Sequence, residues 1–247
     1  MKILFSPSET KSNTITSGPL SDESFIFPHL YEKRLDILNA YQSYIEKSPL
    51  LLLQKLFGYK DEEKTRLHAT INLFTSFTCK AIERYTGVAY QYLDFKTLDA
   101  PSQSFLENNV MIFSNLFGPL LGKDFIPEYK LKQGESFNGL DIETFYKKNF
   151  TDAIDAWCGD ELILDLRAGF YEKFYTLKQP YITMKFLKNG KNVSHFAKAY
   201  RGTVLRDIAY HRPSTEKEFQ KIPFAGLKLK EILLFKYKQE YIFESID

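Results

Sequence analysis

Apolar residues recur every three to four positions in several segments of the chain, a spacing typical of helices with one buried face. The pattern predicts helices over 32–44, 50–57 and 141–157, and Gly159 is placed to end the last of them. The same period runs through 62–85 and predicts one long helix there. The positions on its apolar side are Leu67, Ile71, Phe74, Thr78 and Ile82.

Shorter apolar runs predict strands. The run over 2–5 ends at a polar loop and is typical of a buried strand, as is the run over 162–166. Partial alternation predicts one last strand over 232–243. The run over 110–113 fits a strand or a helix equally well.

A hairpin is predicted between strands over 181–187 and 192–196, because Asn189-Gly190 between them is the strongest short signal for a tight turn. Helices and strands mixed in this way predict an α+β fold with a mixed β-sheet and surrounding helices. No linker or internal repeat divides the sequence. We therefore expect a single domain spanning 1–247.

The spacing of apolar residues predicts a helix over 194–212, and positively charged residues fall on or beside its apolar side. Arg201 falls within the apolar side of this helix, and Lys198 lies at its edge. A guanidinium in that position is costly to bury unless it meets an anion or stays hydrated. The pattern thus predicts either an anion-binding surface or an ion pair with an internal carboxylate. The apolar positions are Tyr200, Val204, Leu205 and Ile208.

The net charge is only +2, but the cations are unevenly distributed. Residues 178–238 contain fourteen Lys and Arg against four Asp and Glu. Such a basic region points either to a polyanionic partner or to a solvated basic face.

Composition limits the possible classes of protein. An apolar content of 44% and an aromatic content of 16% over 247 residues fit a globular chain. Cys79 and Cys158 form no CxxC motif and are expected to be core thiols in a reducing compartment. The scattered histidines predict no metal site, and no cofactor motif is present. The first apolar run is too short for a signal peptide or membrane span, so we expect a cytoplasmic protein without metal or cofactor.

Two further segments are candidates for anion binding. Ser6 and Lys11 belong to a loop that leaves a strand, a common place for a ligand to dock, although Ser and Pro also form ordinary turns. The segment 113–134 is interpreted as a helical hairpin that offers backbone N–H groups to a phosphate, with Lys130 and Lys132 nearby.

Asp165 and Arg167 share one face of a predicted strand, which favours a structural ion pair supporting the site over a catalytic pair. The chain contains no P-loop, GxGxxG, GxSxG or HExxH motif. The sequence therefore favours a binding protein over an enzyme, without deciding between them.

Taken together, five short segments resemble the YaaA family of bacterial peroxide-stress proteins. Glu9 stands where that family usually has Lys, Asn115 replaces a Gly, and Arg167-Ala168-Gly169 replaces small polar residues. The matching segments are FSPSETK at 5–11, YTGV at 85–88, the region 113–134, KAYRG at 198–202 and FAG at 224–226.

The resemblance implies a single α+β domain with a basic cleft, a helix-hairpin-helix element and binding to DNA. It also implies a role in limiting iron-driven oxidative damage during peroxide stress. The leading hypothesis is a monomeric, cytoplasmic protein that binds double-stranded DNA with little sequence preference. The residues expected to contact phosphates are Lys198, Arg201, Arg206, Lys130 and Lys132, with Ser6 and Lys11 in the anion loop.

One alternative is an enzyme acting on a nucleotide or another phosphorylated small molecule. Lys198 and Arg201 then hold the anion, and Asp165 or Glu9 carries the proton. A third possibility is a scaffold with a solvated basic face. A narrow pocket that holds Arg201 near Ser6 favours the enzyme, whereas a wide basic groove favours DNA.

Overall fold

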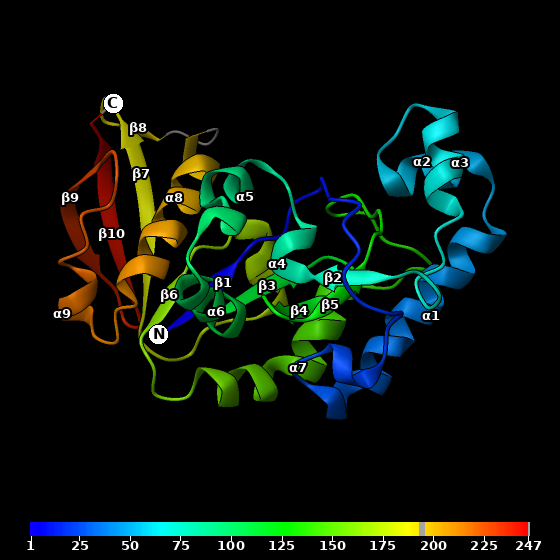
Figure 1. The fold of residues 1–247 in the computed structure, drawn as a ribbon, viewed down its shortest axis with the longest axis horizontal. Helices are drawn as coiled ribbons and strands as arrows, with labels where there is room; N and C mark the ends of the chain where they lie inside the picture. The colour runs from blue at the N-terminus through cyan, green and yellow to red at the C-terminus, as the bar shows by residue number, and fades with distance from the viewer. Residues whose placement is uncertain (193–195, 247) are drawn as a thin grey trace.

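The computed structural model describes residues 1–192 and 196–246. Its centre is an eight-stranded mixed sheet with the order β4-β3-β1-β6-β7-β10-β9, and β8 pairs with β7 (Figure 1). The strands are β1 Lys2–Phe5, β3 Val110–Ser114, β4 Gly118–Leu121, β6 Ile163–Asp165, β7 Tyr181–Lys188, β8 Lys191–Asn192, β9 Leu227–Leu234 and β10 Lys238–Ser245.

The central strands β3, β1, β6, β7 and β10 run parallel, and β4 and β9 run antiparallel at the two edges. Ile3 pairs with Val110 of β3 on one side and with Leu164 of β6 on the other. Every residue of β3 and β6 is buried, because parallel strands in the middle of a sheet are covered on both faces. A separate antiparallel pair joins β2 Thr78–Lys80 to β5 Phe125–Pro127.

Helices cover the sheet. In Figure 1, α5 lies above the sheet with α8 beside it, α7 lies below, and α1 to α3 form the far end of the molecule. The helices are α1 Tyr31–Lys47, α2 Leu50–Phe57, α3 Glu62–Ala69, α4 Ala81–Arg84, α5 Val88–Leu93, α6 Ala100–Asn109, α7 Ile142–Cys158, α8 Phe196–His211 and α9 Glu216–Phe219, with 3₁₀ turns at Asp22–Ser24, Pro28–Leu30, Phe95–Thr97 and, as η4, Gly169–Phe174. Among the described residues, none of these helices is long and apolar enough to cross a membrane.

The chain reverses its direction across the sheet next to β1. It passes from β1 to β3 on one side and later enters β6 on the other side of β1. In open parallel sheets such a reversal leaves a crevice at the carboxyl ends of the two strands, and this crevice is where ligands commonly bind. Here the crevice lies between the loop that begins at Ser6 and the segment that follows Asp165.

Many of the sequence predictions are confirmed. The fold is α+β with a mixed sheet and one main hydrophobic core. Helices α1, α2 and α7 and strands β1 and β6 lie where the pattern predicted them, and Asp141 and Gly159 bound α7. Asn189 and Gly190 both adopt positive φ, 52° and 72°, as the predicted tight turn requires. Cys79 and Cys158 are both buried and free.

The expected long helix over 62–85 is wrong. Helix α3 ends at Ala69, and β2 and α4 follow it. The carboxamide oxygen of Asn72 accepts the N–H groups of Phe74 and Thr75, which turns the chain out of the helix. Leu67, placed on the predicted apolar side, is 66% exposed. Pairing of β2 with the distant β5 overrides the local period.

The helical hairpin expected in 113–134 is also wrong, because β4 and β5 occupy this region after the end of β3. The hydroxyl oxygen of Ser114 accepts the N–H groups of Leu116 and Phe117, and Gly118 adopts a φ of 68°, which together make the turn into β4. No helix-hairpin-helix element is present in this segment.

Two strand predictions change as well. The region 232–243 contains the end of β9 and the start of β10, because the chain turns where Phe235 N–H donates to the Lys238 carbonyl. Phe196, expected at the end of a strand, begins α8, while 193–195 lie outside the described residues. The run over 110–113, which fitted either element, is part of β3.

Candidate functional site

A cavity of about 390 Å³ occupies the crevice at the carboxyl ends of β1 and β6, and we call it the switch cavity. Its walls come from the loop after β1, the segment after β6, the start of α5 and one side of α8. Its volume is in the range of small-molecule sites. The polar and small residues that line it include Ser6, Ser8, Glu9, Ala168, Lys198 and Arg201.

Hydrogen bonds fix the loop after β1 against its neighbours. The Ala168 N–H donates to Ser6 Oγ over 2.8 Å, and the Tyr90 hydroxyl donates to the Ser6 carbonyl over 2.9 Å. The Gly87 N–H donates to Ser8 Oγ over 3.0 Å. These bonds tie β1, β6 and α5 together, so the walls of the cavity are held in place before a ligand arrives.

Close packing of α8 on α5 places the cations at this cavity. A Cβ atom on Gly202 would collide with the Ala89 carbonyl and lie 2.9 Å from the Tyr92 Cβ. Only glycine permits this approach, which puts Arg201 and Lys198, one turn apart on α8, into the lining.

Arg201 is a cation without a partner in the described part of the chain. It is half-buried, and no described residue forms a hydrogen bond or ion pair with it. Burial lowers the pKa of its guanidinium, while the nearby carboxylates of Asp165 and Glu172 oppose this effect. The ion pair considered in the sequence is therefore absent among the described residues.

The buried arginines Arg34 and Arg84 donate to backbone carbonyls, although Arg34 Nε has no partner among the described residues. Arg34 donates to the carbonyls of Phe117 and Pro119, and Arg84 donates to those of Ser12 and Ile126. Such partners offset the cost of removing a cation from water. Arg201 differs from them because it faces a cavity instead of a set of acceptors.

The predicted ion pair of Asp165 and Arg167 is confirmed. Arg167 Nη2 and Nε donate to the two oxygens of Asp165 over 2.7 and 2.9 Å. Arg167 Nη1 donates to the carbonyls of Tyr171 and Tyr175. The pair therefore holds the segment after β6, including the cavity-lining Tyr171, in position.

Three cations expected at phosphates are engaged elsewhere. Arg206 donates to the carbonyls of Leu93 and Asp94 at the end of α5. Lys130 is buried and paired with Glu9 at 3.1 Å, and Lys132 pairs with Glu135 at 3.2 Å. The structure thus brings Ser6, Lys198 and Arg201 together at one cavity. Arg206, Lys130 and Lys132 lie outside its lining.

Lys11 lies behind the loop, against aromatic rings. Its Nζ is 4.0 Å from the Tyr129 ring centre and 5.6 Å from that of Tyr85, and it donates to the Ser8 and Glu9 carbonyls over 3.4 Å. Burial, followed by the positive charge of Lys130, lowers the pKa of Lys11 to about 7. Lys11 is therefore partly neutral at physiological pH.

This lowered pKa predicts a dependence of stability on pH. Between pH 7 and 10.5 the unfolded chain keeps a proton on Lys11 that the folded chain has lost, so the free energy of unfolding rises with pH. We expect the stability of wild type relative to Lys11→Met to increase from about pH 7 to about pH 9 in urea titrations. A difference that stays constant over this range contradicts the assignment.

Sequence reasoning missed several lining residues. Val88, Tyr90, Gln133 and Tyr171 come from three separate segments, and no local pattern marks them as parts of one site. Val88 belongs to the YTGV element and Gln133 to the segment 113–134, both singled out in the sequence, but neither residue was named there as part of a site.

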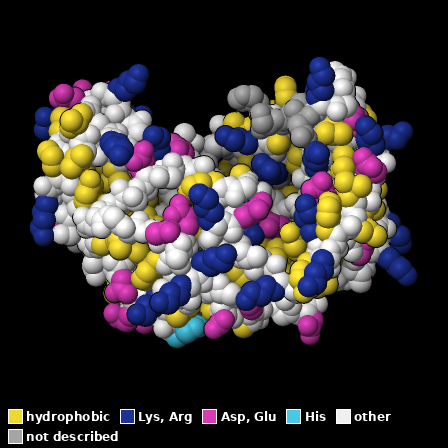
Figure 2. Space-filling model, turned by 180° about the vertical axis from the view of Figure 1, so that it is seen from behind, with side chains coloured by type: hydrophobic (Ala, Val, Ile, Leu, Met, Phe, Trp, Pro, Cys, Tyr) yellow, Lys and Arg dark blue, Asp and Glu magenta, His cyan; other side chains and the backbone are white. Residues whose placement is uncertain are grey.

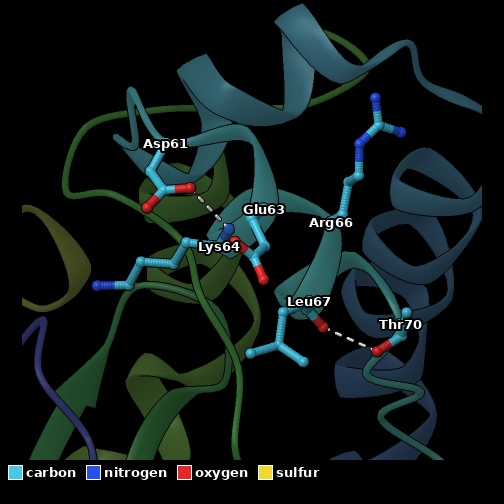
Figure 3. A pocket seen from close by; sticks show the side chains of 6 residues that line it. All are labelled: Asp61, Glu63, Lys64, Arg66, Leu67 and Thr70. Carbon is cyan, nitrogen blue, oxygen red and sulfur yellow. Dashed lines mark hydrogen bonds between the residues drawn. The ribbon is translucent and has the colours of Figure 1, made fainter.

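Another hollow lies on α3. Figure 3 shows that its polar side chains come from one short stretch and point away from one another. Asp61 caps the helix by accepting the Lys64 N–H over 3.0 Å, and Thr70 Oγ1 donates to the Leu67 carbonyl over 2.8 Å. These contacts are the ordinary ends of a helix.

Surface charge and metal ligands give little further guidance. On the face in Figure 2, Lys and Arg side chains are interspersed with Asp and Glu, and no continuous basic track crosses it. Within 1–192 and 196–246, no three His, Cys, Asp or Glu side chains are grouped to hold a metal ion.

Comparisons with known proteins agree with the sequence resemblance. A family model described as "Peroxide stress protein YaaA" matches residues 1–233, a range that contains every segment lining the switch cavity. A protein of Campylobacter jejuni described as uncharacterized is 46% identical over 247 residues, which cover 100% of both chains. A UPF0246 protein of Corynebacterium efficiens is 33% identical over 217 residues, 85% of each chain.

Proposed function

The chain belongs to the YaaA family of peroxide stress proteins, and we propose that it serves that response by binding a small phosphorylated molecule in the switch cavity. Lys198 and Arg201 hold the phosphate, and the Ser6 hydroxyl faces it from the loop after β1. Limiting iron-driven oxidative damage is, in this proposal, an indirect outcome of the binding.

Arg201 is the observation that carries the proposal. A half-buried guanidinium that no described residue satisfies faces the cavity, where its free donors are available to an anion. A phosphate can accept two parallel N–H hydrogen bonds from such a guanidinium. Lys198, exposed on the preceding turn of α8, adds a second positive charge at the same wall.

The form of the cavity favours a small molecule over a duplex. Its volume is about 390 Å³, and apolar residues such as Leu166 and Ala168 are part of its lining, which suits a compact ligand. Asp165, considered as a proton carrier, is already bound through both oxygens to Arg167. We therefore propose binding as the primary activity, with an enzymatic step as the variant in which Glu9 carries the proton.

Double-stranded DNA is the second candidate partner, and the exposed lysines support it. Lys198 at the cavity mouth is exposed, as are Lys217, Lys221, Lys228 and Lys230 in the basic region. Such side chains bind phosphates without reading sequence, and the resulting affinity falls steeply with salt. This binding does not need the cavity or the unpaired state of Arg201.

The test is calorimetric titration with ribose 5-phosphate. Arg201→Gln removes the guanidinium and is expected to weaken binding by at least about tenfold, because a charge-assisted hydrogen bond contributes about 1.5–3 kcal/mol. Arg206→Gln removes the same charge from the same helix. Because Arg206 lies outside the cavity lining, this variant should keep the affinity within about twofold.

Equal affinity of Arg201→Gln and wild type for ribose 5-phosphate contradicts the small-molecule proposal. A parallel titration with a short duplex across salt concentrations tests the second candidate. Affinity for the duplex that falls steeply with salt, together with no binding of ribose 5-phosphate, favours DNA.

A further inference from the structure

Among the described residues that line the switch cavity, Glu9 is the one carboxylate, and its surroundings indicate what it can bind. Its Oε2 accepts from Lys130 Nζ over 3.1 Å, and its Oε1 accepts the Gln133 N–H over 3.3 Å. Each carboxylate oxygen has two acceptor positions. One acceptor position on each oxygen therefore remains for a ligand.

The charge of Glu9 is balanced within the protein. Partial burial raises the pKa of its carboxyl, but the Gln133 N–H and the positive charges of Lys130 and Lys11 outweigh this effect and lower it. Glu9 is therefore ionised and already has its counter-ion. It is suited to accept hydrogen bonds from neutral donors, and a ligand cation would be repelled by Lys130.

Glu9 also acts at a different part of the cavity from Arg201. Arg201 comes to the cavity from α8 and Glu9 from the loop after β1, where the described partners of Glu9 are Lys130 and Gln133. The cavity thus has a cationic part on α8 and a separate acceptor part on the loop after β1. A ligand that uses both parts needs an anionic group joined to hydroxyl groups.

We propose that the switch cavity selects phosphate monoesters with a hydroxyl-bearing carbon skeleton, a class that includes pentose phosphates and nucleoside monophosphates. The phosphate lies at Arg201 and Lys198, and a ligand hydroxyl donates to Glu9. This inference rests on the proposed function, because it assumes a phosphate at Arg201. It adds that Glu9 determines specificity by accepting a hydrogen bond from a hydroxyl group of the ligand.

The experiment compares ribose 5-phosphate with pentyl phosphate, which keeps the phosphate and five carbons but lacks the sugar hydroxyls. Wild type is expected to bind ribose 5-phosphate about tenfold more tightly, since a hydrogen bond to a charged acceptor is worth at least that factor. Glu9→Gln should remove most of this preference, because it weakens binding of ribose 5-phosphate more than binding of pentyl phosphate.

Glu135→Gln is the matched control, because Glu135 pairs with Lys132 outside the cavity lining and its loss should not alter the preference. Equal wild-type affinity for the two phosphates overturns the inference but leaves the proposed function standing. An equal loss for both phosphates in Glu9→Gln overturns it too, since Glu9 then acts through the loop. If neither phosphate binds wild type, the inference and the proposed function fail together.

Discussion

Arg167→Ala is expected to lower the free energy of unfolding by about 3–5 kcal/mol, because it leaves Asp165 buried without its counter-ion. The substitution also removes the donors that hold the Tyr171 and Tyr175 carbonyls. Arg201→Ala, by contrast, should change stability by less than about 1 kcal/mol in phosphate-free buffer, since it breaks no hydrogen bond to a described residue. Urea denaturation of both variants measures the difference.

Both arginines lie near the carboxyl end of the sheet, Arg167 buried and Arg201 half-buried. Arg167 has partners within the protein, whereas Arg201 has none among the described residues. A loss of several kcal/mol in Arg201→Ala would show that the guanidinium is satisfied within the protein. That result would remove the argument for an anion at the switch cavity.

Gly202→Ala is expected to destabilise the protein by about 1–3 kcal/mol, the usual cost of forcing an extra methyl into a packed contact. In an ordinary helix the same change stabilises by about 1 kcal/mol, so the sign of the effect is informative. The new methyl would meet the Ala89 carbonyl and push α8 away from α5. Because α8 carries Arg201 and Lys198, affinity for ribose 5-phosphate should fall together with stability.

Gly18→Ala provides the control, since a Cβ atom there meets nothing within 4 Å. Its stability should stay within about 0.5 kcal/mol of wild type. Thermal and urea unfolding of both variants, with the titration repeated on each, gives the comparison. A Gly202→Ala protein as stable as wild type would mean that α8 and α5 tolerate separation and that the cavity wall is not fixed by this contact.

The sequence predicted those elements whose local pattern agrees with their environment. In α7 the apolar period, the Asp141 cap and the Gly159 stop all point to the same helix, and the structure contains it. The Asn189-Gly190 turn succeeded for the same reason, because only residues that tolerate positive φ fit there.

The failures occurred where distant pairing decided the element. The segment 62–85 has a helical period, but Thr78–Lys80 within it pairs with β5, more than forty residues away. Ser114 turns the chain after β3 with its side-chain oxygen, an interaction that apolar spacing does not encode. Such contacts override the local helix propensity, because each one buries apolar surface that the isolated segment would expose to water.

For the candidate site, the sequence by itself determined that Arg201 lies on the buried side of a helix, that Asp165 and Arg167 sit two residues apart on a strand, and that residues 178–238 are basic. It also indicated the family, through short motifs that occur in this chain in the same order as in the family. These properties depend on residue type and local period, which a sequence states directly.

Only the tertiary structure decided which of these residues meet. The sheet order placed the ends of β1 and β6 side by side, and the close contact of α8 with α5 at Gly202 put Arg201 into the lining of the cavity there. It also paired Lys130 with Glu9 and turned Arg206 toward the carbonyls of α5. Whether a cation is free for a ligand depends on what other segments bring within a few ångströms of it, and this is set by packing across the whole chain.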